Sequence, residues 1–241
     1  MSDSAPPPTP TPSTSTPPAA SAHDLPAVDS LVVGVLGGTG EQGRGLARRW
    51  ALAGQQVVVG SRSPERAETA AFELGHGVRG LGNAACAAAS DVVVVAVPWD
   101  GHRELLESLT AELAGKVVVD CANPLGFDKQ GAYALAVDEG SAAQQAASVL
   151  TGSRVVGAFH HISAVLLLDE AVDRVETDVL VVGDDREATD LVQALANRIP
   201  GMRGVYAGRL RNAHQIEAMT ANLISINRRY KAHAGLRVTD L

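Results

Sequence analysis

The chain has 241 residues, of which 46% are hydrophobic and 20% are charged, and its formal net charge is −7. This length and composition are typical of a globular protein with an ample core. The mild acidity disfavours a nucleic-acid partner, and no apolar run approaches the roughly 18 residues of a membrane-spanning helix. The two cysteines, Cys86 and Cys121, are isolated in the sequence, which suits the reducing cytoplasm. We therefore expect a cytoplasmic protein without nucleic-acid or membrane partners.

Residues 1–30 differ in composition from the rest of the chain. They contain eight of the 12 prolines, many serines and threonines, and no lysine or arginine. Such a segment cannot bury enough apolar surface to order itself, and it lacks the basic and apolar regions of a secretory signal. We predict a disordered tail over 1–30.

The first predicted strand, Leu31–Leu36, ends in a glycine-rich turn, and a helical pattern follows from Arg44 to Leu52. Gly38, Gly40 and Gly43 fit the spacing G-x-G-x-x-G, which seats the pyrophosphate of a dinucleotide. We expect Gly38 to permit the tight turn, Gly40 to let the backbone approach the phosphates, and Gly43 to let the helix pack close to the strand. The motif predicts an anion site at the positive end of that helix.

The second predicted strand, Val57–Gly60, ends in Ser61 and Arg62. An NAD site carries Asp or Glu about 20 residues past the glycines, where it binds the ribose 2′-hydroxyl. Arg62 in that place, with Arg66 in the first turn of the next helix, would instead hold the 2′-phosphate of NADP. The alternative is that both arginines are solvated surface charges, and the spacing favours NADP.

Strands and helices alternate along the rest of the chain. The predicted elements are, in order, helix 65–74, strand 77–80, helix 84–89, strand 91–97, helix 102–113, strand 116–120, helix 141–150, strands 154–159 and 178–182, helix 186–197, strand 204–206 and helix 211–230. This alternation predicts an α/β fold with a doubly wound parallel sheet of the Rossmann type. We expect a nucleotide-binding domain over 31–150 and a smaller C-terminal α/β part over 151–241 that ends in a long helix.

Three loops are expected to converge on the reacting ring, because the carboxyl ends of parallel strands meet at one edge of a sheet. They are residues 97–99, 123–126 and 158–164. Pro98 is interpreted either as a strand stop or as part of a wall beside the nicotinamide. Only one of His160 and His161 easily enters a given pocket, because adjacent side chains on an extended segment point opposite ways. The pair is therefore a poor metal site, and no metal is predicted.

The sequence contains no assembled general acid for a carbonyl substrate. None of the three tyrosines is followed four residues later by a lysine, and no lysine lies in a helix after a substrate loop. A substrate that accepts a hydride with little proton help suits such a site, because holding two rings in contact supplies most of the catalysis. We therefore predict no catalytic side chain.

Six segments resemble the NADPH-dependent reductases of coenzyme F420, a deazaflavin. They are residues 33–40, 58–68, 97–99, 160–164, 182–185 and 208–212, and the similarity runs from about Val32 to the C-terminus. The resemblance implies NADP and coenzyme F420 as cofactors, and direct hydride transfer between C4 of the nicotinamide and C5 of the deazaflavin. Members of the family are dimers, so a homodimer is implied as well. The apolar stripe of the last helix would face a partner helix or the core of its own chain.

The resemblance also implies roles for individual residues. Thr39, Gly40, Glu41 and Gln42 would contact the NADP phosphates, Ser61, Arg62 and Arg66 the 2′-phosphate, Val97, Pro98 and Ala164 the nicotinamide end, and His160, Ile162 and Leu236 the deazaflavin. The coenzyme carries an anionic phosphate and glutamate tail, so basic residues are expected at the entrance of its binding site. Its candidates, by sign alone, are Arg209, Arg211, Arg228 and Arg237.

Two other functions remain open, because a shared nucleotide-binding scaffold does not fix the second substrate. One is an NADP-dependent imine or ketone reductase. The other is a non-catalytic NADP sensor that signals through a partner.

Overall fold

The computed structural model describes residues 25–241, and most of the predicted tail therefore lies outside the described residues. Residues 25–30 belong to the folded part. Val28 is buried, and its carbonyl accepts a hydrogen bond of 2.9 Å from Gln55 Nε2. The folded chain thus begins before residue 31, where the composition changes.

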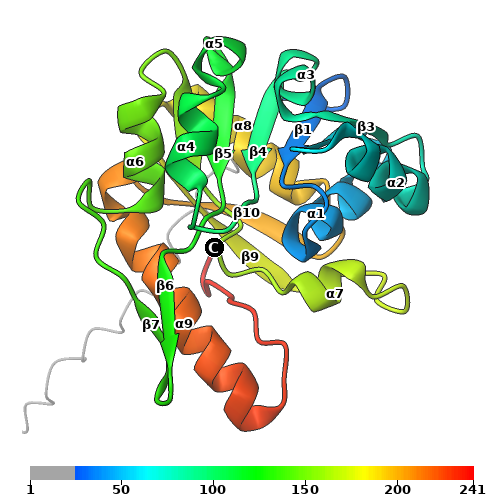
Figure 1. Cartoon of the computed structure of the whole chain (residues 1–241). Coiled ribbons are helices and arrows are strands. Elements are labelled where there is room, and N and C mark those ends of the chain that lie inside the picture. Colours follow the sequence, from blue (N-terminus) through cyan, green and yellow to red (C-terminus); the bar gives the residue numbers. More distant parts are fainter. Residues whose placement is uncertain (1–24) are drawn as a thin grey trace, which may run out of the picture.

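Eight strands form one sheet in the order β10-β9-β8-β5-β4-β1-β2-β3, with helices on both sides (Figure 1). The strands are β1 Val32–Leu36, β2 Gln56–Ser61, β3 Arg79–Gly82, β4 Val92–Val95, β5 Val117–Asp120, β8 Arg154–Gly157, β9 Thr177–Gly183 and β10 Met202–Gly208. Valine dominates the central strands, because a parallel sheet covered on both faces is buried throughout. The predicted doubly wound α/β architecture is confirmed.

The sheet divides the apolar core into two layers, and each layer is covered by its own set of helices. Their bounds are α1 Glu41–Leu52, α2 Pro64–Leu74, α3 Asn83–Ala88, α4 His102–Glu107, α5 Thr110–Leu113, α6 Ala142–Val149, α7 Ala164–Leu168, α8 Arg186–Asn197 and α9 Ala213–Tyr230. One layer lies between the sheet and α1, α2, α7 and α8. The other lies between the sheet and α3, α4, α5, α6 and the beginning of α9. The single helix expected over 102–113 is divided into α4 and α5.

The last two strands run against the direction of the others. β8 pairs with β9 antiparallel, with Gly157 opposite Val182, whereas β9 and β10 are parallel to each other. The sequence predicts a wholly parallel sheet. The only helix between β8 and β9 is the five-residue α7, which spans about 7.5 Å and is too short to return the chain along a strand. Consequently the turn at 183–185 lies at the opposite edge from the loops that follow β1, β4 and β5.

A hairpin of β6 Leu125–Asp128 and β7 Gly131–Ala134 packs beside α9 and projects with it from the sheet (Figure 1). The sequence patterns do not predict this hairpin. In the apolar stripe of α9, Ile216 and Leu223 are buried against the chain itself, whereas Ile226 and Tyr230 are 40% and 73% exposed. The stripe therefore serves the core of its own chain only over its first half.

The C-terminal segment after α9 returns to the sheet along the beginning of β9. The backbone N–H of Asp178 donates to Leu236 O at 2.8 Å, and Leu236 N–H donates to Thr177 Oγ1 at 3.0 Å. No helix within residues 25–241 is long and apolar enough to cross a bilayer.

Arg49 fastens the segment around α7 to α1. Its buried guanidinium donates to the carbonyl of Leu167 at 2.8 Å and to three more carbonyls, those of Leu166, Asp169 and Val172. A planar fork of donors matches these acceptors, and a lysine ammonium does not. This one side chain thus supplies hydrogen-bond donors to the carbonyl groups at the end of α7, the helix that follows the loop containing His160.

We expect Arg49→Lys to lower the free energy of unfolding by about 2–4 kcal/mol, because buried carbonyls lose their donors. Urea denaturation measures the change. The matched control is Arg48→Lys, whose one ion pair among residues 25–241 is with Glu170 at 4.0 Å and whose effect should stay below about 0.5 kcal/mol. Equal losses in the two variants would contradict the anchoring role of Arg49.

Candidate functional site

The glycine-rich turn lies between β1 and α1 at the carboxyl edge of the sheet. Gly37 has a φ of 76°, and a Cβ built there would lie 2.4 Å from Ala96 O, so Gly37 and not Gly38 makes the tight turn. Gly38 instead lies against the side chain of Val59. Gly40 is the N-cap of α1 and offers no side-chain cap. The first N–H groups of α1 are therefore open to an anion.

A cavity of about 420 Å³ opens in front of this turn. It is lined by Gly37, Thr39, Gly40, Ser61, Arg62, Ser63, Arg66, Asn83, Ala96, Val97, Pro98, Asp100, Gly101 and Leu105. Ser63 caps α2, with its hydroxyl accepting from Arg66 N at 3.3 Å, which holds both arginines at the rim. Within residues 25–241, neither Arg62 nor Arg66 forms an ion pair. Two exposed guanidinium groups without acidic partners suit a phosphate.

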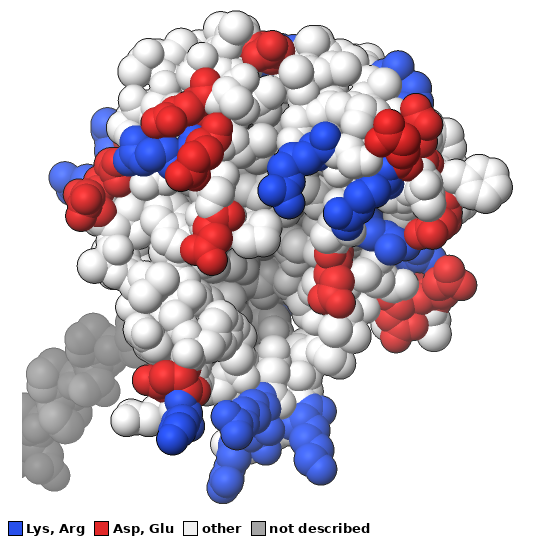
Figure 2. Space-filling view, viewed as in Figure 1, with Lys and Arg blue, Asp and Glu red and all other residues white. Residues whose placement is uncertain are grey.

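A second chamber of about 320 Å³ adjoins the first. It is lined by Gly40, Glu41, Gln42, Ala96, Val97, Pro98, Trp99, Cys121, Asn123 and His160. Gly40 and residues 96–98 line both chambers, so the two form one continuous cleft. Figure 2 shows the molecule hollowed here, above the projecting hairpin and α9. Pro98 and Trp99 thus serve as walls of the cleft, and not only as the end of a strand.

His160 faces the second chamber with an unusual set of contacts. The ring is 4% exposed, and neither ring nitrogen has a hydrogen-bond partner within the described residues. Its carbonyl, by contrast, accepts from Asn123 Nδ2 at 2.8 Å and from Thr220 Oγ1 at 3.3 Å. Burial lowers the pKa of His160, so the ring is neutral near pH 7. A neutral, unpartnered imidazole beside a cavity offers one donor and one acceptor to a ligand.

The turn before His160 is held in a conformation that few residues adopt. Phe159 has a φ of 63°, and its buried ring meets Trp50 edge-on at 5.4 Å. Gln42 Nε2 donates to Phe159 O at 3.2 Å. Strained backbone of this kind persists only where the surroundings fix it, and it concentrates at functional sites. It orients His160 toward the chamber, whereas His161, also buried, does not line it.

Most of the residues that sequence reasoning selects for NADP are therefore brought together. Thr39, Gly40, Glu41, Gln42, Ser61, Arg62, Arg66, Val97 and Pro98 all line the cleft. Ile162, Ala164 and Leu236 do not line either chamber, although they lie on neighbouring segments at the same edge. Ile162 is buried in the core, and Ala164 is the first residue of α7. Among residues 25–241, no group of three His, Cys, Asp or Glu side chains could hold a metal ion.

Comparison with known proteins identifies the family. A profile of the family described as NADP oxidoreductase, coenzyme F420-dependent, matches residues 32–124. The F420-dependent NADP reductase of Methanothermobacter thermautotrophicus is 40% identical over 87% of this chain and 95% of its own length. This chain belongs to the family of F420-dependent NADP reductases. The reductase of the same name from Methanocaldococcus jannaschii is 37% identical over 87% of this chain and 98% of its own length.

Among solved structures, this chain is similar to a protein from Arthrobacter sp. FB24 that is described as an F420-dependent NADP reductase. Its TM-score is 0.76 at 25% identity, and the match covers 87% of this chain and 99% of the other. The shared fold therefore extends over most of this chain.

Behind the cleft, this reductase carries a buried ionic pair that sequence reasoning misses. His102 Nε2 lies 2.6 Å from Asp120 Oδ2, and both side chains are fully buried. His102 begins α4, directly after the wall formed by Pro98 and Trp99, and Asp120 ends β5. The pair thus ties two walls of the cleft together. The only sequence feature that could have indicated this pair is Asp120, a charged residue at the end of a strand that otherwise consists of valines.

The protonation of this pair follows from its neighbours. Gln145 Nε2 donates to the Glu139 carboxylate at 3.3 Å, so Gln145 Oε1 is the acceptor that His102 Nδ1 meets at 3.1 Å. His102 Nδ1 must therefore carry a proton, and the contact with Asp120 requires a second one. Although burial alone lowers the pKa of His102, the Asp120 carboxylate and its hydrogen bond raise it above the usual range.

We expect His102→Gln to lower the free energy of unfolding by about 3 kcal/mol at pH 6, with a smaller loss at pH 9. A raised pKa means that the stabilisation is complete below the ordinary histidine pKa of about 6.5 and is lost as the pH rises through the folded-state value. Chemical denaturation at both pH values measures this. The exposed His214 provides the control, His214→Gln, with little effect at either pH. A loss that grows with pH would refute the charged pair.

Proposed function

We propose that this chain is an oxidoreductase that transfers a hydride between NADP(H) and coenzyme F420. The observation that carries the proposal is the continuous cleft, which has two free arginines at one end and the unpartnered His160 ring at the other. One end suits a 2′-phosphate and the other a polar ring. The 40% identical relative named for both coenzymes supports the same pair of substrates.

NADP occupies the first chamber and the wall that both chambers share. Ser61, Arg62 and Arg66 bind the 2′-phosphate, and the backbone from Gly38 to Gln42 receives the pyrophosphate. Glu41 is exposed, so its carboxylate stays in water while its N–H faces the phosphates. The Val97–Pro98 wall and, from α7, Ala164 border the nicotinamide. Exposed guanidinium groups also discriminate against NADH, which has no 2′-phosphate to bind.

The deazaflavin ring lies in the second chamber, against His160 from the C-terminal part that we assign to residues 151–241. The ring nitrogens of His160, which have no hydrogen-bond partner within the described residues, make the polar contact to the deazaflavin. Ile162 and Leu236 lie on adjacent segments of the same edge and border the ring from there. This arrangement holds the two rings in contact, and the hydride passes directly from C4 of the nicotinamide to C5 of the deazaflavin or back. No side chain forms a covalent bond to either substrate, and positioning supplies the catalysis.

The same proposal extends to assembly and location. A homodimer is supported by the exposed apolar side chains of the hairpin and α9, namely Phe127 at 69%, Ile226 at 40% and Tyr230 at 73% exposure. A cytoplasmic location is supported by Cys86 and Cys121, which are both free thiols. The mild net acidity disfavours a nucleic-acid partner.

The test is a mixture of purified protein, NADPH and oxidised coenzyme F420, in which loss of the deazaflavin absorption band is followed. We expect rapid bleaching that depends on the protein. Oxidation of NADPH with an imine or ketone, but not with the deazaflavin, would instead identify an imine or ketone reductase. Binding of NADPH without turnover of any acceptor would identify a sensor.

Arg62→Ala should weaken NADPH binding by about ten- to a hundredfold, which corresponds to loss of a charge-assisted contact worth about 1.5–3 kcal/mol. NADH binding should change less than about threefold, because NADH has no group for Arg62 to hold. Fluorescence titration with both nucleotides measures the two affinities. The control is Arg79→Ala, an exposed arginine at the beginning of β3. Equal losses for the two nucleotides would contradict the 2′-phosphate role.

A further inference from the structure

The carbonyl groups of Phe159 and His160 are held by three side chains that come from three separate elements. Gln42, in the first turn of α1, donates from Nε2 to Phe159 O at 3.2 Å. Asn123, which follows β5, donates from Nδ2 to His160 O at 2.8 Å. Thr220 of α9 has its Oγ1 at 3.3 Å from the same oxygen and at 3.4 Å from Asn123 Oδ1, so its one proton is shared between them. These contacts fix the turn that presents the His160 ring to the second chamber.

Gln42 joins this turn to the element that faces the first chamber. It is the second residue of α1, whose first N–H groups are open to an anion because Gly40 provides no side-chain cap. In the sheet, β1 and β8 are separated by β4 and β5, so the contact of Gln42 with Phe159 spans the carboxyl edge above two strands. The backbone of Gln42 therefore belongs to the glycine-rich turn, and its amide group belongs to the turn that carries His160.

The rest of the same face of α1 packs against the segment that follows. Gln42, Gly45 and Arg49 succeed one another at three- and four-residue steps, which place them on one side of a helix. A Cβ built at Gly45 would lie 2.6 Å from Leu167 Cβ, and Arg49 donates to Leu167 O at 2.8 Å. Gly45 and Arg49 lie in the middle and last turns of α1, whereas Gln42 lies in the first turn, where a helix without partners for its N–H groups opens most readily. The contact with Phe159 is thus the part of this interface most sensitive to an anion at α1.

Phe159 has a backbone conformation that depends on α1. Its φ of 63° lies in the left-handed region, which a bulky residue adopts only where its surroundings impose it. Its buried ring meets Trp50 of α1 edge-on. Its carbonyl accepts from Gln42 and, at the longer distance of 3.5 Å, from Ile162 N–H. The conformation of Phe159 in turn sets the direction of the next side chain, His160.

We propose that Gln42 is a positioning residue that couples the two halves of the cleft, so that a nucleotide bound at α1 strengthens binding of the second substrate at His160. This inference rests on the proposed function, since it links the binding of its two substrates. The pyrophosphate fixes the first turn of α1, Gln42 keeps its bond to Phe159 O, and the left-handed conformation persists. Without the nucleotide the turn loosens and His160 leaves the chamber in a fraction of the molecules. Each ligand orders the turn that the other needs, so both affinities rise by the same factor.

The test measures binding of oxidised coenzyme F420 by equilibrium dialysis, with and without saturating NADP+. Both ligands are oxidised, so no hydride passes between them. For the wild-type protein we expect coenzyme F420 to bind about five- to tenfold more tightly when NADP+ is present. Gln42→Met keeps the length of the side chain and removes its donor, and the two affinities should then agree within about twofold. Hydrogen exchange of residues 158–164 should slow on addition of NADP+ in the wild-type protein and not in this variant.

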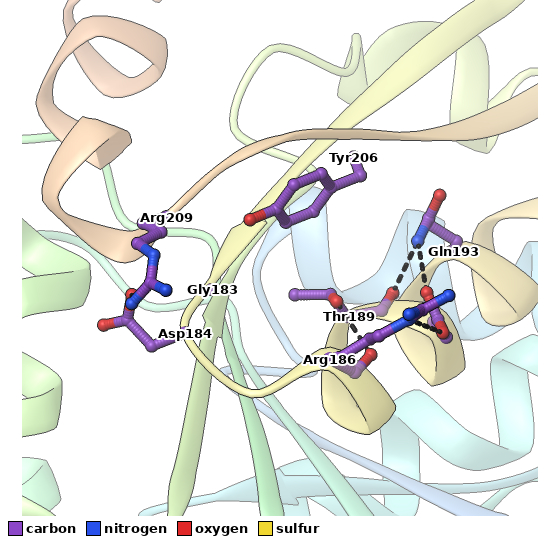
Figure 3. Close-up of a pocket in the computed structure, with 8 residues that line it drawn as sticks. Gly183, Asp184, Arg186, Thr189, Gln193, Tyr206 and Arg209 are labelled. Carbon is purple, nitrogen blue, oxygen red and sulfur yellow. Dashed lines mark hydrogen bonds and ion pairs between the residues drawn. The ribbon is translucent and has the colours of Figure 1, made fainter.

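Gln193→Met is the matched control. Gln193 also lies on a helix and donates from Nε2 to a backbone carbonyl, that of Thr189, at 3.3 Å. It lines a separate cavity with Tyr206 and Arg209, at the opposite edge of the sheet from the cleft (Figure 3). The same loss of a donor at this distant place should leave the wild-type ratio of the two affinities unchanged.

A second variant, Thr220→Val, loosens the turn from the other side. It removes a donor to His160 O that comes from α9 and not from the helix that receives the nucleotide. Binding of coenzyme F420 should weaken about two- to fivefold, equally with and without NADP+. The ratio of the two affinities should therefore stay at the wild-type value.

The outcomes separate the coupling from the proposed function. If the wild-type protein binds and reduces coenzyme F420 with the same affinity in the presence and absence of NADP+, the coupling is wrong and the function stands. A Gln42→Met variant that keeps the wild-type ratio, or a Gln193→Met or Thr220→Val variant that loses it, also overturns the role of Gln42. If the wild-type protein neither binds nor reduces coenzyme F420, the proposed function fails, and the coupling fails with it.

Discussion

The site depends on one constraint, the common direction of β1, β2, β4, β5 and β8. Because these strands are parallel, the turns that follow them meet at a single edge of the sheet. The glycine turn, the arginines, the Pro98 wall, Asn123 and His160 are far apart in the chain, and only this shared direction gathers them in one cleft. The valine runs that bury the strands on both faces hold the turns in register.

The reversed direction of β9 and β10 brings the C-terminal segment to the edge of the sheet that holds the cleft. Since β9 runs against β8, its first residues extend past the carboxyl end of β8, and the C-terminal segment pairs with them through Leu236. The end of the chain therefore returns to the edge that holds the cleft. In a wholly parallel sheet, the beginning of β9 and its partner segment would lie at the opposite edge, away from His160.

The predictable parts of this protein are those coded by short stretches of sequence. The glycine spacing, the Ser61–Arg62 pair and the valine strands each carry their own signal, and they predict most of the fold and the residues at the end of the cleft that we propose binds NADP. The direction of β9, the contact of Arg49 with four carbonyls and the pairing of His102 with Asp120 join distant segments, and no local pattern specifies them. The β6–β7 hairpin is missed because its strands are only four residues each, too short for a clear periodic signal. The assignment of the other end of the cleft to the deazaflavin consequently rests on resemblance and not on a local sequence pattern.

The ionisable groups around the second chamber are consistent with the hydride transfer that we propose there. His102 is committed to Asp120 and Gln145. Burial raises the pKa of Glu217 to about 7, and its carboxylate oxygens accept from Ala142 and Ala143 at the beginning of α6. His160, which alone of these groups faces the chamber, is kept neutral by burial, and its lowered pKa makes it a poor general acid near pH 7. The chamber thus has walls tied together by a buried ion pair, and the buried imidazole that faces it is neutral. Such a site acts on two rings mainly by holding them in contact.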